Sequence, residues 1–218
     1  MDIKQIRSQV AAMLRSHSVK IANADNYLQA AVTVPLVDVD GHPSVLFEVR
    51  SGNLQWQPGE ICFPGGRIEA ADSSPLAAAV RETIEELYVQ PEAIEVLGPL
   101  DIMVNPIGVM IYPFVIHLAA GLPFTPNAAE VAEVFTVPLE FLLNTKPRVA
   151  SMEMATKPLA GFPFDLLPPD YPQGYRRRYK YQVLFYQYKN YVIWGLTAGV
   201  LEEFLNTFRN HTDGAMNV

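Results

Sequence analysis

The chain has 218 residues, of which 50% are apolar, and a formal net charge of −7. This length fits one domain, and the apolar half provides a sizeable core, which argues against a disordered chain. The negative charge argues against nucleic acid as the partner, because such partners require a basic surface. The first residues, MDIKQIRSQV, have no apolar signal core, and the most apolar run, Ile107 to Leu118, is too short to span a bilayer. We therefore expect a cytoplasmic protein with no membrane partner.

Hydrophobic periodicity and turn residues predict the elements of the first half of the chain. In chain order these are a helix at residues 2–16, strands at 29–37 and 45–50 joined by a turn at 40–43, short strands at 61–63 and 67–69, and a helix from Pro75. Asp2 is placed to cap the first helix, and Ser74 followed by proline is a start signal for the second.

The second half of the chain is predicted in the same way. In chain order its elements are strands at residues 94–103, 109–118 and 131–137, a short helix at 138–143, a hairpin of strands at 181–188 and 191–194, and a helix at 197–208. Residues 150–179 are rich in proline and aromatic residues, and we expect a long irregular segment lying over the domain. Strands on both sides of a central helix, with a last helix at the end, predict a mixed sheet packed between helices.

The helix that begins at Pro75 carries three carboxylates on one face, Glu82, Glu85 and Glu86. On a helical wheel with about 100° per residue and Arg81 at zero, these acids fall between roughly 40° and 140°. The apolar residues fall on the other side, between roughly 220° and 300°: Leu76, Val80, Ile84 and Leu87. We therefore expect the apolar stripe to face the core and the acids to point the opposite way, toward the Pro-Gly-Gly turn.

Three acids at this spacing repel one another, and Arg81 is expected to offset only one of them. Two interpretations relieve the conflict. A hard divalent cation would be held by the carboxylate oxygens, which Mg²⁺ and Mn²⁺ prefer as ligands. Alternatively, the acids form a solvated face, as most glutamate runs on helices do.

The segment PGGRIEAADSSPLAAAVRETIEELYV, Pro64 to Val89, resembles the Nudix box, which has a glycine, an acid and then R-E-x-x-E-E. Eight residues separate Asp72 from Arg81, a spacing that resembles the coenzyme A pyrophosphatase branch of the Nudix hydrolases. Two further segments resemble that branch: VLFEVRS with PGEICFPGGR at residues 45–51 and 58–67, and VIWGLTAGVLEEFL at 192–205. The likeness covers roughly residues 36–208.

The chain also departs from the pattern of that branch. A basic L-R-x-H run usually precedes the Pro-Gly-Gly loop, and here residues 54–57 read LQWQ, which removes two contacts to a phosphate-rich ligand. Tyr88 stands where glycine normally follows the paired glutamates, so we expect a different exit from the helix. Asp72 stands where glutamate is common.

The resemblance implies an α/β fold, the Nudix-type α/β/α sandwich with a mixed β-sheet between helices. It implies a single Nudix hydrolase domain over residues 1–218, with an N-terminal helix at about 2–16 and a C-terminal extension at about 145–210 packed on it. It also implies Mg²⁺- or Mn²⁺-dependent hydrolysis of a diphosphate bond, since divalent metals neutralise phosphate charge and activate water. The implied metal ligands are Glu82, Glu85, Glu86 and the backbone of Gly66.

The same resemblance implies the catalytic residues. Glu82 or Glu85 would also accept a proton, and Arg81 would orient the acids. Many Nudix enzymes place a general base on a distant loop, and Glu130 at a strand entrance has freer geometry for this than Glu133. The alternative for Glu130 is an exposed loop acid.

Other polar residues have weaker assignments. Glu69 and Asp72 are expected to hold the loop onto the helix start, and Glu60 to reach the phosphates. The basic cluster, residues 176–180, either contacts phosphate or adenine or forms an exposed loop or edge strand. Cys62 is expected to be a buried strand residue.

The leading hypothesis for the function is a hydrolase that cleaves coenzyme A or an acyl derivative into 3′,5′-ADP and (acyl-)4′-phosphopantetheine. The alternatives are hydrolysis of another nucleoside diphosphate derivative, such as ADP-ribose or NADH, and a non-catalytic nucleotide sensor with the same fold. The expected partner is therefore a small-molecule nucleoside diphosphate, and we also allow for a homodimer.

Overall fold

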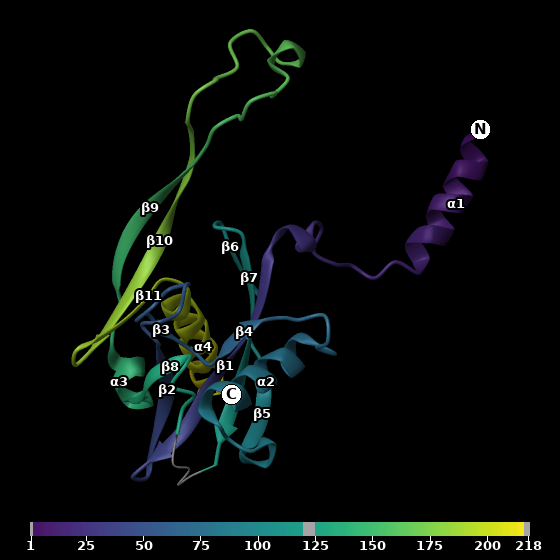
Figure 1. Ribbon diagram of the computed structural model, residues 1–218. Helices are drawn as coiled ribbons and strands as arrows, with labels where there is room; N and C mark the ends of the chain where they lie inside the picture. Colours follow the sequence, from purple (N-terminus) through teal and green to yellow (C-terminus); the bar gives the residue numbers. More distant parts are fainter. Residues whose placement is uncertain (1, 120–124, 216–218) are drawn as a thin grey trace.

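The computed structural model describes residues 2–119 and 125–215, and a mixed eight-stranded sheet forms its centre (Figure 1). The strands of this sheet are β1 (Leu28–Val39), β2 (His42–Arg50), β3 (Ile61–Cys62), β4 (Gly65–Arg67), β5 (Ile94–Pro99), β6 (Met103–Asn105), β7 (Val109–Leu118) and β8 (Val131–Pro138). Strands β1 and β7 are parallel, and the other pairs are antiparallel. The sheet confirms the predicted α/β fold.

The remaining elements are helices and a second sheet. The α-helices are α1 (Ile3–Arg15), α2 (Pro75–Leu87), α3 (Leu139–Asn144) and α4 (Gly195–Ala215), and short 3₁₀ turns lie at η1 (Ala24–Asn26), η2 (Pro91–Ala93) and η3 (Phe164–Leu166). The second sheet has three strands, β9 (Arg148–Thr156), β10 (Arg176–Tyr188) and β11 (Tyr191–Trp194). No helix in residues 2–119 and 125–215 is long and apolar enough to cross a membrane.

The two faces of the central sheet bury different helices. Successive side chains of a strand point to opposite faces. Accordingly, Phe47 packs in the core cluster that contains Leu201 and Leu205 of α4, whereas Leu46 packs with Leu87 of α2. The sheet therefore lies between α2 and α4, as the sequence predicted.

The predicted helix at residues 2–16 is present, and its cap residue is the expected one. The Asp2 carboxylate accepts a hydrogen bond from the Lys4 backbone N–H at 3.4 Å. Every described residue of α1 is exposed, including its apolar face, and the helix lies away from the central sheet in Figure 1.

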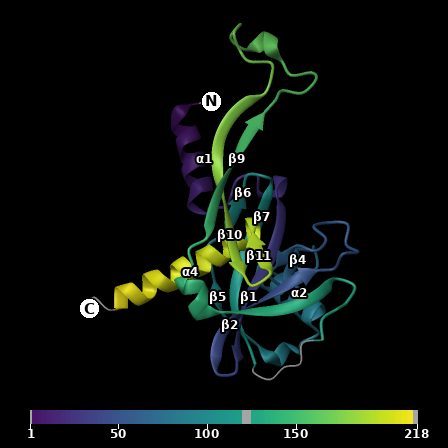
Figure 2. The ribbon, with the colours of Figure 1, turned by 90° about the vertical axis from the view of Figure 1, so that its left-hand side faces the viewer.

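The prediction of an irregular segment at residues 150–179 is wrong at both ends. Residues 148–156 and 176–185 pair as antiparallel strands of β9 and β10, and this ribbon projects from the body of the protein (Figures 1 and 2). The prolines that motivated the prediction all lie between the strands, at positions 158 to 172. Most residues at 148–156 and 176–182 of this ribbon are exposed, so the segment is not packed over the domain.

The predicted short strand at 67–69 is displaced to Gly65–Arg67, where the glycines themselves pair with β1. The expectation for Tyr88 is also wrong. Tyr88 caps α2 with φ 51° and ψ 38°, the left-handed conformation that a glycine would adopt. The helix therefore ends in the same backbone conformation that a glycine would give, although Tyr88 carries a Cβ.

Replacing Tyr88 with glycine should relieve this backbone strain. The left-handed conformation costs an L-residue roughly 1–2 kcal/mol, and the Tyr88 side chain is 61% exposed, so little packing is lost. We expect Tyr88→Gly to have a free energy of unfolding about 1 kcal/mol above that of Tyr88→Ala, measured by urea denaturation. Alanine is the matched control because it also removes the ring but keeps the Cβ. Equal stability of the two variants would contradict the strained exit.

Candidate active site

Small side chains bring α2 close to the sheet. Ala78, Ala79 and Thr83 are fully buried, and the hydroxyl groups of Thr83 and Thr33 of β1 lie 2.9 Å apart. The predicted apolar stripe is therefore wrong in part: of its members Leu87 is buried, whereas the other three are only half-buried. The helix is rotated so that Glu86, 4% exposed, joins the buried face. The sequence pattern ranked the positions of α2 by hydrophobicity. The face that packs against the sheet is instead formed mainly by small residues, because the helix lies close to the strands.

The backbone of β4 runs directly beside the acids of α2. The Gly65 N–H donates to Glu86 Oε2 at 2.8 Å. A Cβ added to Gly66 would lie 2.5 Å from the Glu82 carboxylate, and one added to Gly65 would lie 2.4 Å from the Ala31 carbonyl oxygen. At Gly65, where φ is +148°, a side chain would collide with the backbone of β1, and at Gly66 it would displace the Glu82 carboxylate.

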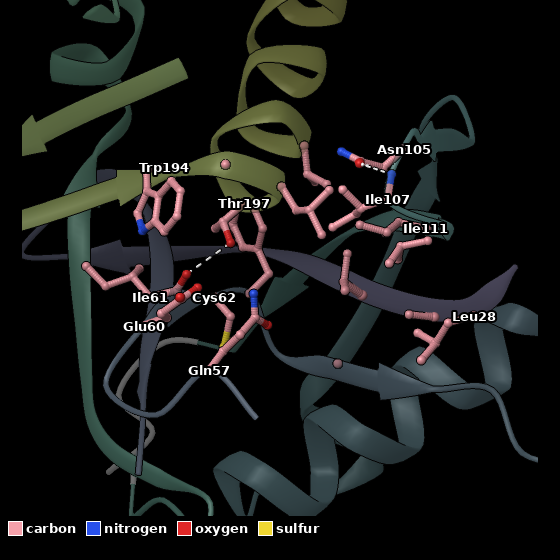
Figure 3. Close-up of a pocket in the computed structure, with 18 of the residues that line it drawn as sticks. Leu28, Gln57, Glu60, Ile61, Cys62, Asn105, Ile107, Ile111, Trp194 and Thr197 are labelled. Atoms are coloured by element: carbon pink, nitrogen blue, oxygen red, sulfur yellow. Dashed lines mark hydrogen bonds between the residues drawn. The ribbon is translucent and has the colours of Figure 1, made fainter. Parts of the chain in front are cut away.

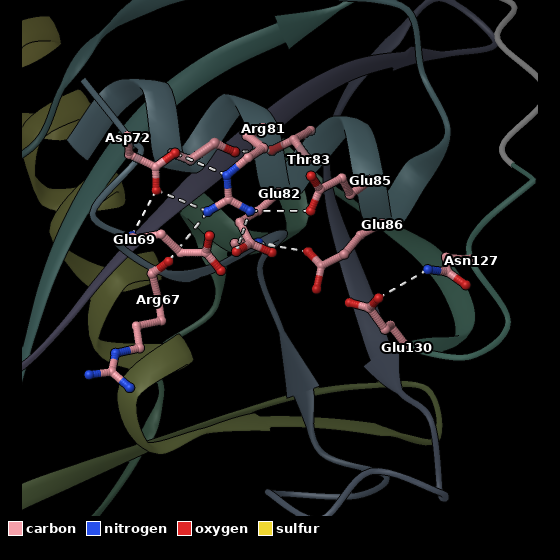
Figure 4. Close-up of polar contacts among 12 residues, drawn as sticks. Arg67, Glu69, Asp72, Arg81, Glu82, Thr83, Glu85, Glu86, Asn127 and Glu130 are labelled. Carbon is pink, nitrogen blue, oxygen red and sulfur yellow. Dashed lines mark hydrogen bonds and ion pairs between the residues drawn. The ribbon is translucent and has the colours of Figure 1, made fainter. Parts of the chain in front are cut away.

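Arg81 connects the helix to the preceding loop (Figure 4). Its guanidinium group contacts both oxygens of Asp72 at 3.0 Å, and its Nη1 contacts Glu82 at 2.9 Å and Glu85 at 3.2 Å. The prediction that Arg81 offsets only one of the three helix acids is therefore wrong. These hydrogen bonds hold the pKa of Asp72 below its ordinary value and raise the pKa of Arg81.

Asp72 has the geometry of a loop anchor. Besides pairing with Arg81, its Oδ2 accepts a hydrogen bond from the Glu69 N–H at 2.8 Å. This arrangement closes residues 69–72 as a turn ahead of α2, which is the position expected for a residue that holds the loop. The carboxylate of Asp72 is therefore occupied by protein partners.

The loop at residues 127–130 is hydrogen-bonded to α2 and to the residue that follows β2, and this brings Glu130 to the acids. The Asn127 N–H donates to the Glu86 carbonyl oxygen at 2.8 Å, and the Ser51 N–H donates to the Glu130 carbonyl oxygen at 2.7 Å. The side chain of Glu130 accepts from Asn127 at 3.0 Å and lies beside Glu86 in Figure 4.

Glu133, the other candidate for a general base, is directed elsewhere. Its carboxylate accepts a hydrogen bond from the Tyr191 hydroxyl group on β11. That hydrogen bond raises the pKa of Tyr191. The structure thus brings Glu130, but not Glu133, to the acids of α2.

Glu48 is a member of the acidic cluster that the sequence analysis missed. It lies on β2, its side chain is 1% exposed, and among the described residues neither carboxylate oxygen has a hydrogen-bond partner. Burial, followed by the charge of the neighbouring Glu86, raises the pKa of Glu48 well above its ordinary value. Burial is also the main reason why the pKa of Glu86 rises to about 8. The available signal was one acid inside the apolar run VLFEV.

The residues present fit a hard divalent cation. No three His, Cys, Asp or Glu side chains within the described ranges are already arranged as a cage, because Arg81 holds Glu82 and Glu85 and the Gly65 N–H holds Glu86. The donor set is nevertheless oxygen-only and negative, and it includes the unpartnered carboxylate of Glu48. A cation of the Mg²⁺ type prefers such ligands and would offset their repulsion.

A pocket of about 590 Å³ opens on the other side of β4, beside the first turn of α4 (Figure 3). Its lining is mainly apolar and includes Val32, Phe63, Ile111, Trp194 and Val200. The lining also includes polar residues, among them Arg50, Gln57, Glu60 and Arg67. Gly65 and Gly66 belong to its wall as well, so the same backbone contributes to the pocket and to the acidic cluster.

Two further sequence candidates lie outside the acidic cluster. Cys62 lines the pocket, and burial raises the pKa of its thiol, which keeps it protonated and unsuited to be a nucleophile. The basic residues lie on the projecting ribbon, where Arg177 pairs with Glu153 and Arg178 Nε donates to the Thr156 hydroxyl group. They therefore form part of an exposed strand.

Comparison with known proteins identifies the family. Residues 27–154 match the model of the NUDIX domain. The chain is 32% identical over 178 residues to the uncharacterized Nudix hydrolase NudL of Enterobacter sp. (strain 638), covering 82% of this chain and 81% of NudL. It is 33% identical over 179 residues to NudL of Escherichia coli (strain K12), with the same shares covered. The chain therefore belongs to the Nudix family, and it is a hydrolase of nucleoside diphosphate derivatives of the class that generally depends on divalent metals.

The similarity to solved structures covers a smaller part of this chain. A binary complex of Caenorhabditis elegans Ap4A hydrolase is 18% identical with a TM-score of 0.43, covering 51% of this chain and 80% of that one. The NUDIX domain of Shewanella oneidensis NrtR, crystallised with ADP ribose, is 24% identical with a TM-score of 0.42, covering 62% and 87%.

A methyl group at position 66 should disrupt the site without unfolding the protein. In Gly66→Ala the new Cβ would displace the Glu82 carboxylate, and a misplacement of about 1 Å can cost about a hundredfold in rate. We expect a loss of that order in diphosphate hydrolysis, with an unchanged circular dichroism spectrum. Gly52→Ala is the matched control, since nothing lies within 4 Å of its Cβ. Full activity of Gly66→Ala would refute the close approach of β4 to Glu82.

Proposed function

We propose that the protein is a metal-dependent hydrolase that cleaves the diphosphate bond of coenzyme A or acyl-coenzyme A. Water adds across the bond, and the products are 3′,5′-ADP and 4′-phosphopantetheine or its acyl derivative. The observation that carries this proposal is the lining of the 590 Å³ pocket. The two segments that resemble the coenzyme A branch, PGEICFPGGR and VIWGLTAGV, lie far apart in sequence but both line this pocket.

The pocket also suits the chemistry of this substrate. Its volume lies in the range of small-molecule sites, and the pantetheine and acyl parts of coenzyme A are long and uncharged. An apolar lining would accommodate them, while Arg50 and Arg67, which also line the pocket, would face the phosphates. The diphosphate would then lie near Gly65 and Gly66, beside the acids of α2.

Each acidic residue has a role in this proposal. Glu82, Glu85 and Glu86, with the Gly66 carbonyl group, would hold Mg²⁺ or Mn²⁺, which neutralises phosphate charge and lowers the pKa of bound water. Arg81 orients Glu82 and Glu85 through its contacts to both. Glu130, which is oriented by the hydrogen bond from the Asn127 side chain, would take the proton from the attacking water.

Glu85 offers a direct test of these roles. It is 54% exposed and contacts only Arg81 among the described residues, so it contributes little to packing. We expect Glu85→Gln to lower kcat about a hundredfold or more, with a melting temperature within about 2 °C of the wild type. Glu140→Gln, an exposed acid on α3, removes the same charge and should leave kcat unchanged. Normal turnover by Glu85→Gln would show that Glu85 is not a metal ligand.

The alternative substrates are ADP-ribose and NADH. They are motivated by the LQWQ run, because Gln55 and Gln57 stand where the coenzyme A branch has basic residues, and Gln57 lines the pocket. A panel of coenzyme A, acetyl-coenzyme A, ADP-ribose and NADH, assayed with Mg²⁺ and with Mn²⁺, decides between them. We expect the highest kcat/KM for a coenzyme A species. An advantage of tenfold or more for ADP-ribose would overturn the choice, and binding without metal-stimulated cleavage would favour a nucleotide sensor.

A further inference from the structure

Glu48 is the one buried acid of the cluster that the roles above leave unused. Its neighbours along β2, Leu46 and Phe47, are fully buried apolar residues, as expected for a strand covered on both faces. Its strand partners are Cys62 on β3 and Val134 on β8, neither of which is a cation. A carboxylate at this position therefore needs a specific partner, because an isolated buried charge is strongly unfavourable.

The groups that face Glu48 are predominantly negative. Alternation along β2 directs Glu48 to the same face as Leu46, which packs against α2. The negative charges of Glu86 and Glu130 act on its carboxylate and raise its pKa. Two ionised carboxylates are both acceptors, so neither satisfies the other.

The positive charge of Arg50 acts on both acids and favours their ionised forms, but Arg50 makes no hydrogen bond to Glu48. Its Nε donates to the Trp56 carbonyl oxygen at 3.3 Å, and among the described residues both oxygens of Glu48 are left without a hydrogen bond. Glu86 at least accepts from the Gly65 N–H. Among the described residues Glu48 therefore has no hydrogen-bonded cationic partner, and its carboxylate is available to a positively charged group from outside the chain.

We propose that Glu48 is an additional carboxylate ligand of the divalent cation, reaching it from the sheet side while Glu82, Glu85 and Glu86 reach it from α2. This inference rests on the proposed function only in that the acids of α2 form a metal site. It assigns to β2 a ligand that lies outside the box residues 66–86. Its consequence is tighter metal binding by an added hard oxygen ligand.

The test measures metal binding directly. Mn²⁺ affinity is determined by calorimetry and by electron paramagnetic resonance of free Mn²⁺ for the wild type, Glu48→Gln and the exposed control Glu140→Gln. Glutamine has the same size as glutamate but no charge. We expect Glu48→Gln to weaken Mn²⁺ binding tenfold or more and Glu140→Gln to change it less than twofold. Affinity of Glu48→Gln within twofold of the wild type overturns the proposal.

Melting temperatures with EDTA and with saturating Mn²⁺ separate a ligand from a structural acid. If Glu48 is a ligand, Glu48→Gln should melt at or above the wild type in EDTA, because the repulsion with Glu86 is removed, and should gain less from Mn²⁺. A lower melting temperature in EDTA with an undiminished gain from Mn²⁺ indicates a structural role. If the glutamine variant does not fold, Glu48→Thr is measured in the same way, and failure of both to fold also overturns the proposal.

The same measurements distinguish this inference from the proposed function. Wild-type protein that hydrolyses its substrate and binds Mn²⁺ no better than Glu48→Gln would contradict the role of Glu48 alone. Wild-type protein that binds no Mn²⁺ would contradict both.

Discussion

The short separation between α2 and the backbone of β4 is the constraint on which the site depends. A helix can approach a sheet this closely only if both surfaces are nearly without side chains. Ala78 and Ala79 of α2 pack against Ala31 of β1, and Gly65 and Gly66 form the neighbouring β4. The approach lets Glu86 accept the Gly65 N–H and brings the Glu82 carboxylate against Gly66. The buried hydrogen bond between the hydroxyl groups of Thr33 and Thr83 holds α2 against β1, the strand that pairs with β4.

The same packing concentrates negative charge. Arg81 is shared among Asp72, Glu82 and Glu85, whereas Glu48 and Glu86 are buried without a hydrogen bond to a cationic side chain among the described residues, and burial raises the pKa of both. Unpaired buried charge costs stability, and proteins keep such conflicts mainly where function requires them. If these acids hold a divalent cation as proposed, metal binding would offset their repulsion and stabilise the folded protein.

Much of the fold could be predicted from the sequence because the relevant signals are local. Strand runs, the Ser74–Pro75 helix start and the box motif located the sheet, α2 and its acids in the correct order. The rotation of α2 could not be predicted from hydrophobicity, because it depends on the small size of Ala79 and Thr83 against β1. The outer parts of β9 and β10 were hidden by the prolines between them.

The candidate site was predicted only where a motif marks it. The box acids and Glu130 meet in the structure, and the loop hydrogen bonds at Asn127 and Ser51 explain how Glu130 arrives there. Glu48 had no motif, and its meaning depends on non-local neighbours, since β2 meets α2 only through the fold. Tyr88 shows the opposite case, in which a residue changed but the backbone conformation did not.

The wall of the 590 Å³ pocket is formed by residues from both sheets. One side comes from the central sheet and carries Gly65 and Gly66, while Met152, Tyr181 and Trp194 belong to the separate three-stranded sheet that packs against α4. Substitutions in β9, β10 and β11 can reshape the pocket without moving the glycine backbone from the acids. Evolution can therefore alter which organic group is accommodated while the hydrolytic end stays constant, and new specificities can arise within one scaffold.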